Sequence, residues 1–161
     1  MFALALTLTL SLSGAEPAAG PKACAGVPVV AGEAAIGAGG ASLIGAAVMV
    51  ALWNGSHDVA TLDILAPAVI ILGGLGGGIF ELDGNGYFLS GAIGGWAGGL
   101  IGASVAVIAS LLGLIGYFGV LSPGQTVSGQ TIENGFINAF AVGAVVGAAL
   151  GAEMGTATVE E

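Results

Sequence analysis

The chain has 161 residues, of which 56% are hydrophobic, 7% are charged and 32 are glycine. A typical soluble domain has about a quarter of its residues charged. This composition, with a mean hydropathy of +1.04, therefore excludes an ordinary soluble domain and indicates that the solvent is lipid. A single Lys or Arg against ten Asp or Glu gives a net charge of −9, which excludes nucleic-acid binding through neutralised phosphates.

The N-terminal residues have the pattern of a secretory signal peptide. The apolar run Phe2–Leu12 is too short to cross about 30 Å of hydrocarbon as a helix, and the small residues Ser13–Ala15 follow it. Small residues before the cleavage site are typical of signal peptides. We therefore expect residues 1–15 to be removed, the alternative being an uncleaved N-terminal helix. A predicted linker of Pro, Ala and Gly covers residues 16–28.

Four long apolar segments follow this linker. About 20 helical residues cross the hydrocarbon of a bilayer, and neutral segments of about this length or longer alternate with short polar turns. The sequence therefore predicts an all-α membrane protein, with a four-helix transmembrane domain over residues 29–153 and an acidic tail at 154–161. The predicted transmembrane helices cover residues 29–53, 63–80, 87–120 and 132–152.

Aromatic residues support these boundaries. Trp and Tyr favour the interface between lipid and water, and Trp53 and Tyr117 lie near ends of predicted helices. Trp96 lies inside the third predicted helix, so we expect it to face lipid or to fill a gap between helices.

Small residues recur at every fourth position of each predicted helix. Glycine lowers helix stability by about 1 kcal/mol relative to alanine, so this abundance needs a structural reason. Positions four apart share one helix face. A face without side chains lets helix backbones approach closely, where dispersion and Cα–H···O contacts hold them together in lipid. We therefore predict packing through small-xxx-small faces. The predicted helix-packing residues are Gly37, Ala41, Gly45, Gly73, Gly77, Gly91, Gly95, Gly99, Gly135, Ala139, Gly143, Gly147 and Gly151.

Two of these rows have the spacing GxxxGxxxG, namely Gly91-Gly95-Gly99 and Gly143-Gly147-Gly151. On these residues the chain resembles the glycine-zipper membrane proteins, and the small uncharacterised proteins of the bacterial cell envelope that repeat such helices. The resemblance covers most of residues 30–152. It implies close helix packing and a membrane location, and it implies no activity.

Candidate catalytic and metal sites are few. His57 stands between Ser56 and Asp58, but residues adjacent in sequence do not usually reach the geometry of a catalytic triad, so we expect a solvated turn. Glu81–Gly86 resembles the first half of a calcium loop, whose twelfth-position Glu would fall on Ala92. The loop is therefore incomplete, and a helix-connecting turn explains it better. We predict that the chain is not an enzyme and has no catalytic residue, cofactor or metal.

Glu33, Glu133 and Glu153 need separate attention, because a carboxylate inside lipid is costly and marks function. All three lie within about one turn of a predicted helix end, where they can reach water. We therefore expect them to be interfacial charges. The predicted loops have neither Lys nor Arg, so the positive-inside rule does not fix the orientation.

The sequence therefore predicts a non-enzymatic integral membrane protein of the bacterial cell envelope, in the inner membrane rather than the outer, with a structural or assembly role. Its expected partners are the lipid bilayer and a second copy of the chain, with no nucleic acid and no small-molecule ligand. Two alternatives stay open. One is a small pore or transporter subunit in which Glu33 or Glu153 lines a path. The other is an outer-membrane β-barrel, although the apolar runs do not alternate as barrel strands do.

Overall fold

A computed structural model describes residues 27–79, 88–121 and 126–157. No strand occurs in these ranges, so the all-α fold class is confirmed and the β-barrel alternative is wrong. The signal-peptide residues, the linker up to residue 26 and the candidate calcium loop lie outside the described residues. The helices are α2 (Val27–Ser56), α3 (Val59–Ile79), α4 (Phe88–Gly116), its π-helical continuation η2 (Tyr117–Leu121) and α5 (Gly129–Ala157).

Each α-helix is long and apolar enough to cross a membrane. By length and composition the candidate spans are Gly32–Ser56, Val59–Ile79, Phe88–Gly119 and Gly129–Ala157. At 1.5 Å per residue, a 21-residue helix such as α3 is about 31 Å long, which is close to the thickness of the hydrocarbon core. The membrane-spanning part of the prediction therefore matches the structure in number and position.

Polar caps extend these helices beyond the predicted boundaries. His57 ends α2 in the left-handed conformation, with φ 50°, and its backbone N–H donates to the carbonyl of Trp53 at 2.8 Å. Asp58 then caps α3, because its Oδ1 accepts the N–H of Ala60 at 3.0 Å. Ser128 caps α5 in the same way by accepting the N–H of Thr131. Caps of this kind satisfy the free N–H groups of a first turn, so α3 and α5 begin in polar sequence, before their apolar runs.

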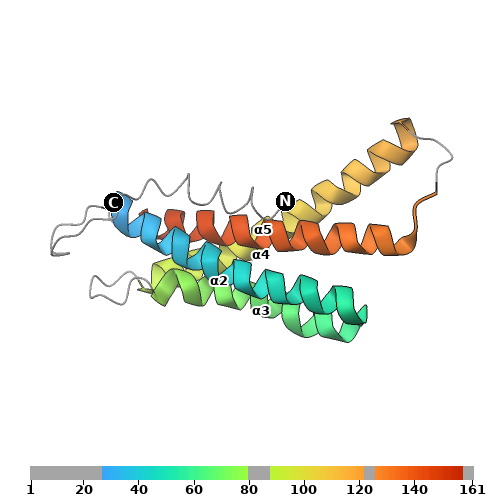
Figure 1. Cartoon of the computed structure of the whole chain (residues 1–161). Coiled ribbons are helices and arrows are strands. Elements are labelled where there is room, and N and C mark those ends of the chain that lie inside the picture. The colour runs from blue at the N-terminus through green and yellow to red at the C-terminus, as the bar shows by residue number, and fades with distance from the viewer. Residues whose placement is uncertain (1–26, 80–87, 122–125, 158–161) are drawn as a thin grey trace.

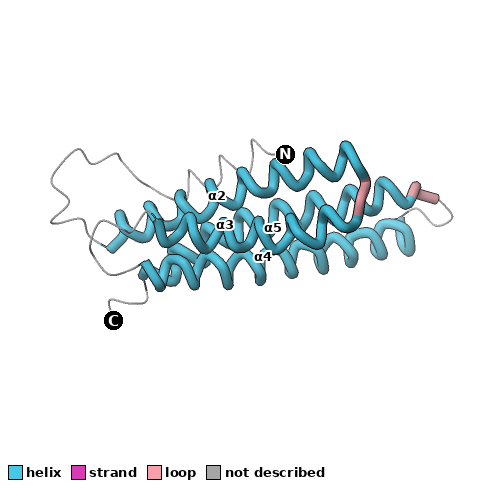
Figure 2. The backbone as a smooth tube through the Cα atoms, turned by 90° about the horizontal axis from the view of Figure 1, so that it is seen from below, coloured by secondary structure: helices cyan, strands magenta, loops and turns pink. Residues whose placement is uncertain are grey.

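The four helices pack side by side as an antiparallel bundle (Figures 1 and 2). Going around the bundle, α2 contacts α3, α3 contacts α4, α4 contacts α5 and α5 returns to α2. Figure 1 shows that the start of α2 and the end of α5 lie at the same end. It also shows the second half of α4 diverging from α5. The bundle is therefore closed at the end with the start of α2 and open beside the second half of α4.

The size of the buried side chains differs between the two ends of the bundle. At the closed end the hydrophobic core cluster is formed by alanines, namely Ala34 and Ala38 of α2 with Ala148 and Ala152 of α5. Toward the α2–α3 turn the core has larger side chains. These include Met49, Trp53, Val69, Ile137 and Val145. Small residues bring the helices together at one end and larger ones separate them at the other.

The two tryptophans have opposite environments. Trp53 is only 3% exposed, and its indole N–H donates to Oδ1 of Asn134 on α5 at 2.7 Å. Trp53 lies three residues before the end of α2, as the sequence predicts, but its ring is buried against α5 instead of being exposed at a lipid–water interface. Trp96 is 50% exposed, which agrees with the expectation that it faces lipid.

Replacing Trp53 by Phe should lower the free energy of unfolding by about 1 kcal/mol, because one partly buried hydrogen bond is lost and Asn134 is left without its donor. Trp96→Phe is the matched control and should change stability little, because that ring is half-exposed. Unfolding in mixed micelles, followed by circular dichroism, measures both. A loss for Trp96→Phe equal to that for Trp53→Phe would contradict the structural role of Trp53.

Candidate functional site

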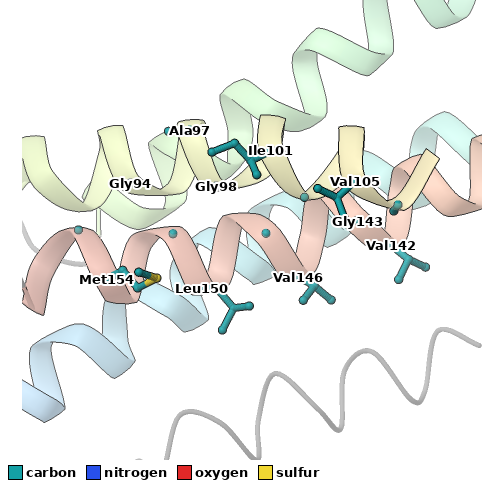
Figure 3. Close-up of a pocket in the computed structure, with 15 residues that line it drawn as sticks. Gly94, Ala97, Gly98, Ile101, Val105, Val142, Gly143, Val146, Leu150 and Met154 are labelled. Atoms are coloured by element: carbon teal, nitrogen blue, oxygen red, sulfur yellow. The ribbon is translucent and has the colours of Figure 1, made fainter. Parts of the chain in front are cut away.

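In a close contact between α4 and α5, glycine faces glycine (Figure 3). A Cβ atom added to Gly98 would overlap the carbonyl oxygen of Gly147 and would lie 2.7 Å from Cα of Gly151. A Cβ at Gly102 would overlap the carbonyl of Gly143 in the same way. Only hydrogen fits at these positions without a shift of one backbone, so the two main chains are in direct contact.

This contact is long and has a regular antiparallel register. Each step of four residues forward along α4 corresponds to four residues back along α5. The register continues one turn beyond the predicted row, because a Cβ at Gly155 would lie 2.5 Å from the carbonyl oxygen of Ser90. From Ser90 to Ala106 the contact covers about 24 Å of helix. The pairs are Ser90 with Gly155, Gly94 with Gly151, Gly98 with Gly147, and Gly102 and Ala106 with Gly143.

A second glycine contact joins α3 to α4. A Cβ at Gly77 would lie 2.6 Å from the carbonyl oxygen of Gly91, and one at Gly95 would lie 2.7 Å from that of Gly73. Gly99, the third residue of this predicted row, has only ordinary van der Waals neighbours at 3.6 Å or more. The α4 helix therefore packs on α3 through one glycine row and on α5 through another.

The predicted residues of α2 lie against α3. A Cβ at Gly76 would overlap the carbonyl of Gly37 and would lie 2.7 Å from Cβ of Ala41. A Cβ at Gly45 would lie 2.9 Å from Cδ1 of Leu72. Gly37, Ala41 and Gly45 thus share one interface, as their spacing predicts for a single helix face.

Two predicted residues lie outside these contacts. Gly135 is exposed, with no atom within 4 Å of an added Cβ, and Ala139 is only half-buried. In the antiparallel register, Gly135 would pair with a residue near position 110, where α4 has diverged from α5 (Figure 1). The row on α5 therefore makes contacts from Gly143 onward.

One important row was absent from the predicted residues. Gly94 and Gly98 make the tightest contacts of α4, together with Gly102. Their four-residue spacing equals that of Gly91-Gly95-Gly99, so the same signal could have found them. Spacing alone does not say which neighbour each row faces.

The polar residues at the α2–α3 turn do not form a catalytic arrangement. The His57 ring lies edge-on to Trp53, with centroids 5.4 Å apart, and its Nε2 is 3.1 Å from Nε2 of Gln130. Asp58 caps α3, and the Ser56 hydroxyl donates to the carbonyl of Leu52 at 2.9 Å. The backbone N–H of Asp58 also donates to the Ser56 hydroxyl at 3.4 Å, but none of the hydrogen bonds in the described part of the chain joins the side chains of Ser56, His57 and Asp58 to one another. Within the described ranges, no three His, Cys, Asp or Glu side chains come together as metal ligands.

The three glutamates of the prediction lie near the helix ends. Glu33 and Glu153 are half-buried, and Glu133 is exposed. The buried polar side chains among the described residues are Ser42 and Thr156. The Ser42 hydroxyl donates to the carbonyl of Val69 at 3.3 Å, and the Thr156 hydroxyl donates to that of Ala152 at 2.6 Å. Both hydroxyls are thus satisfied within the protein.

Comparison with known proteins gives no relative for this arrangement. No family model, curated protein or solved structure matches the chain. The functional argument therefore depends on the helix contacts and charges described above.

Gly147→Ala tests the α4–α5 contact. The added methyl overlaps the carbonyl of Gly98, and overpacking of this kind costs about 1–3 kcal/mol. Gly135→Ala is the matched control on the same helix, where open space leaves only the gain in helix propensity of about 1 kcal/mol or less. Unfolding free energies in mixed micelles should therefore change in opposite directions. Equal tolerance of the two substitutions would contradict direct backbone contact.

Proposed function

We propose that the chain is a non-enzymatic integral membrane protein of the bacterial cell envelope, with a structural or assembly role and helices packed as a glycine zipper. The observation that carries this proposal is the row of backbone contacts between α4 and α5. Such contacts suit a hydrocarbon solvent, where the hydrophobic effect gives little drive for helix association and close packing replaces it.

The distribution of charge supports a membrane location. Glu33 and Glu153 lie near the closed end of the bundle, while Asp58, Asp63 and Glu133 lie toward the other end. The helix segments between them are uncharged. Because a charge at the centre of a bilayer is costly, this pattern supports a position of the neutral segments in hydrocarbon. Four apolar helices fit the inner membrane, since outer-membrane proteins of bacteria typically cross as closed barrels.

The bundle interior favours a structural role over a pore. A water path needs polar groups along its length, and the two buried hydroxyls in the described part of the chain, those of Ser42 and Thr156, are bonded to backbone carbonyls. Between the closed end and the α2–α3 turn the interior is alanine and larger apolar side chains. The side chains of Ser56, His57 and Asp58 bond to groups outside this trio, which likewise favours a protein without catalysis.

Flux measurements on purified protein in liposomes separate the two roles. We expect proton and small-ion flux no higher than in protein-free vesicles, and no change with Glu33→Gln or Glu153→Gln. A known channel protein reconstituted in parallel shows that the assay responds. Flux that either substitution reduces would overturn the structural role and establish the pore.

A further inference from the structure

The outer face of α4 and α5 has an apolar groove directly over the glycine contact (Figure 3). We call it the α4–α5 groove, and its volume is about 750 Å³. Gly98 and Gly147 lie at its floor and are only half-buried. Its walls include Ile101 and Val105 of α4 and Val146 and Leu150 of α5. The glycine backbone is therefore partly exposed along the groove, between rows of larger apolar side chains.

We propose that this groove binds α4 of a second copy of the chain, and that the two copies exchange this contact around a two-fold axis. The inference rests on the proposed membrane location and names the partner and the surface for self-association. In this arrangement Ile101 and Val105 of each copy insert over the half-open glycines of the other. Ridges of one helix set into the grooves of another are the common mode of helix packing.

The α4 helix has exposed apolar side chains that could insert into the groove of a second copy. Ile101 is 63% exposed and Val105 is 59% exposed, and the two lie four residues apart, so they form one ridge. They stand beside the groove that the partner's ridge would fill. One copy therefore offers both a ridge and a groove on the same face, which is the self-complementarity that a two-fold interface requires.

The distribution of charged residues favours the α4 face as the interface between two copies. The segment Phe88–Leu121 has no charged residue, whereas α2, α3 and α5 each contain at least one carboxylate. The described residues include no Lys or Arg, so two copies that met through other faces would bring carboxylates together without a compensating cation. A contact centred on α4 brings together the one helix of each copy that has no carboxylate, and this favours α4 as the centre of the interface.

Cysteine cross-linking of the full chain in bilayers tests the proposal. In a Cys24→Ser background, Ile101→Cys places two thiols across the two-fold axis, and we expect a disulfide-linked dimer that persists when the protein is diluted in lipid. Ile64→Cys is the control. Gly73 of α3 lies beside Gly95 of α4, so Ile64 is within one turn of the depth of Ile101, and it is 73% exposed. We expect loss of its cross-link on dilution.

A second variant fills the groove without touching the glycine contact. Ala97 lines the groove, so Ala97→Leu should abolish the Ile101→Cys dimer, whereas Ala109→Leu, at an exposed position of α4, should leave it intact. Retention of each variant in the membrane after alkaline extraction shows that it has inserted. Equal cross-linking at Ile101 and Ile64 would overturn the proposal. A protein that stays monomeric would also overturn the proposal, and lipid or residues 1–26 would then be the candidates to fill the groove. An extractable protein would instead overturn the proposed membrane location.

Discussion

The rest of the structure depends on direct contact between the α4 and α5 backbones. Along about 24 Å of helix, from Ser90 to Ala106, no atom larger than hydrogen fits at the glycine positions of this interface. A single such contact is weak, since each pair of heavy atoms gains only about 0.1–0.2 kcal/mol. The contact stabilises because it repeats at every turn. It also gives a structural reason for the glycine rows of α4 and α5, which would otherwise only weaken these helices.

This contact also determines where the helices of the bundle lie close together and where they diverge. Where glycine and alanine face one another the helices lie close together, around a core cluster of four alanines. Past Ala106 the second half of α4 diverges from α5 (Figure 1), and exposed residues such as Ile108 and Leu112 face outward. The closed end with its alanine core supports the structural role proposed above.

Much of the fold could be predicted from the sequence, because apolar runs of spanning length are read directly from hydropathy. The helix ends were less accurate, since Asp58 and Ser128 begin helices in polar sequence through single hydrogen bonds. The burial of the Trp53 ring could not be predicted, because its hydrogen-bond partner Asn134 is distant in sequence. The spacing of glycines identifies faces that can pack, but not their partners. The row of Gly94 and Gly98 was therefore absent from the prediction, and Gly135, which the structure leaves without a neighbour, was included.

Solid-state NMR of the protein in bilayers, with only its glycines labelled with carbon-13, tests this account most directly. Direct backbone contact predicts through-space correlations between Cα of Gly98 and Cα of Gly147 and Gly151, and between Gly102 and Gly143. These pairs are far apart in the chain, so no helix alone produces them. A spectrum with only neighbouring-residue correlations would show that the bare backbones face lipid, and it would contradict the account.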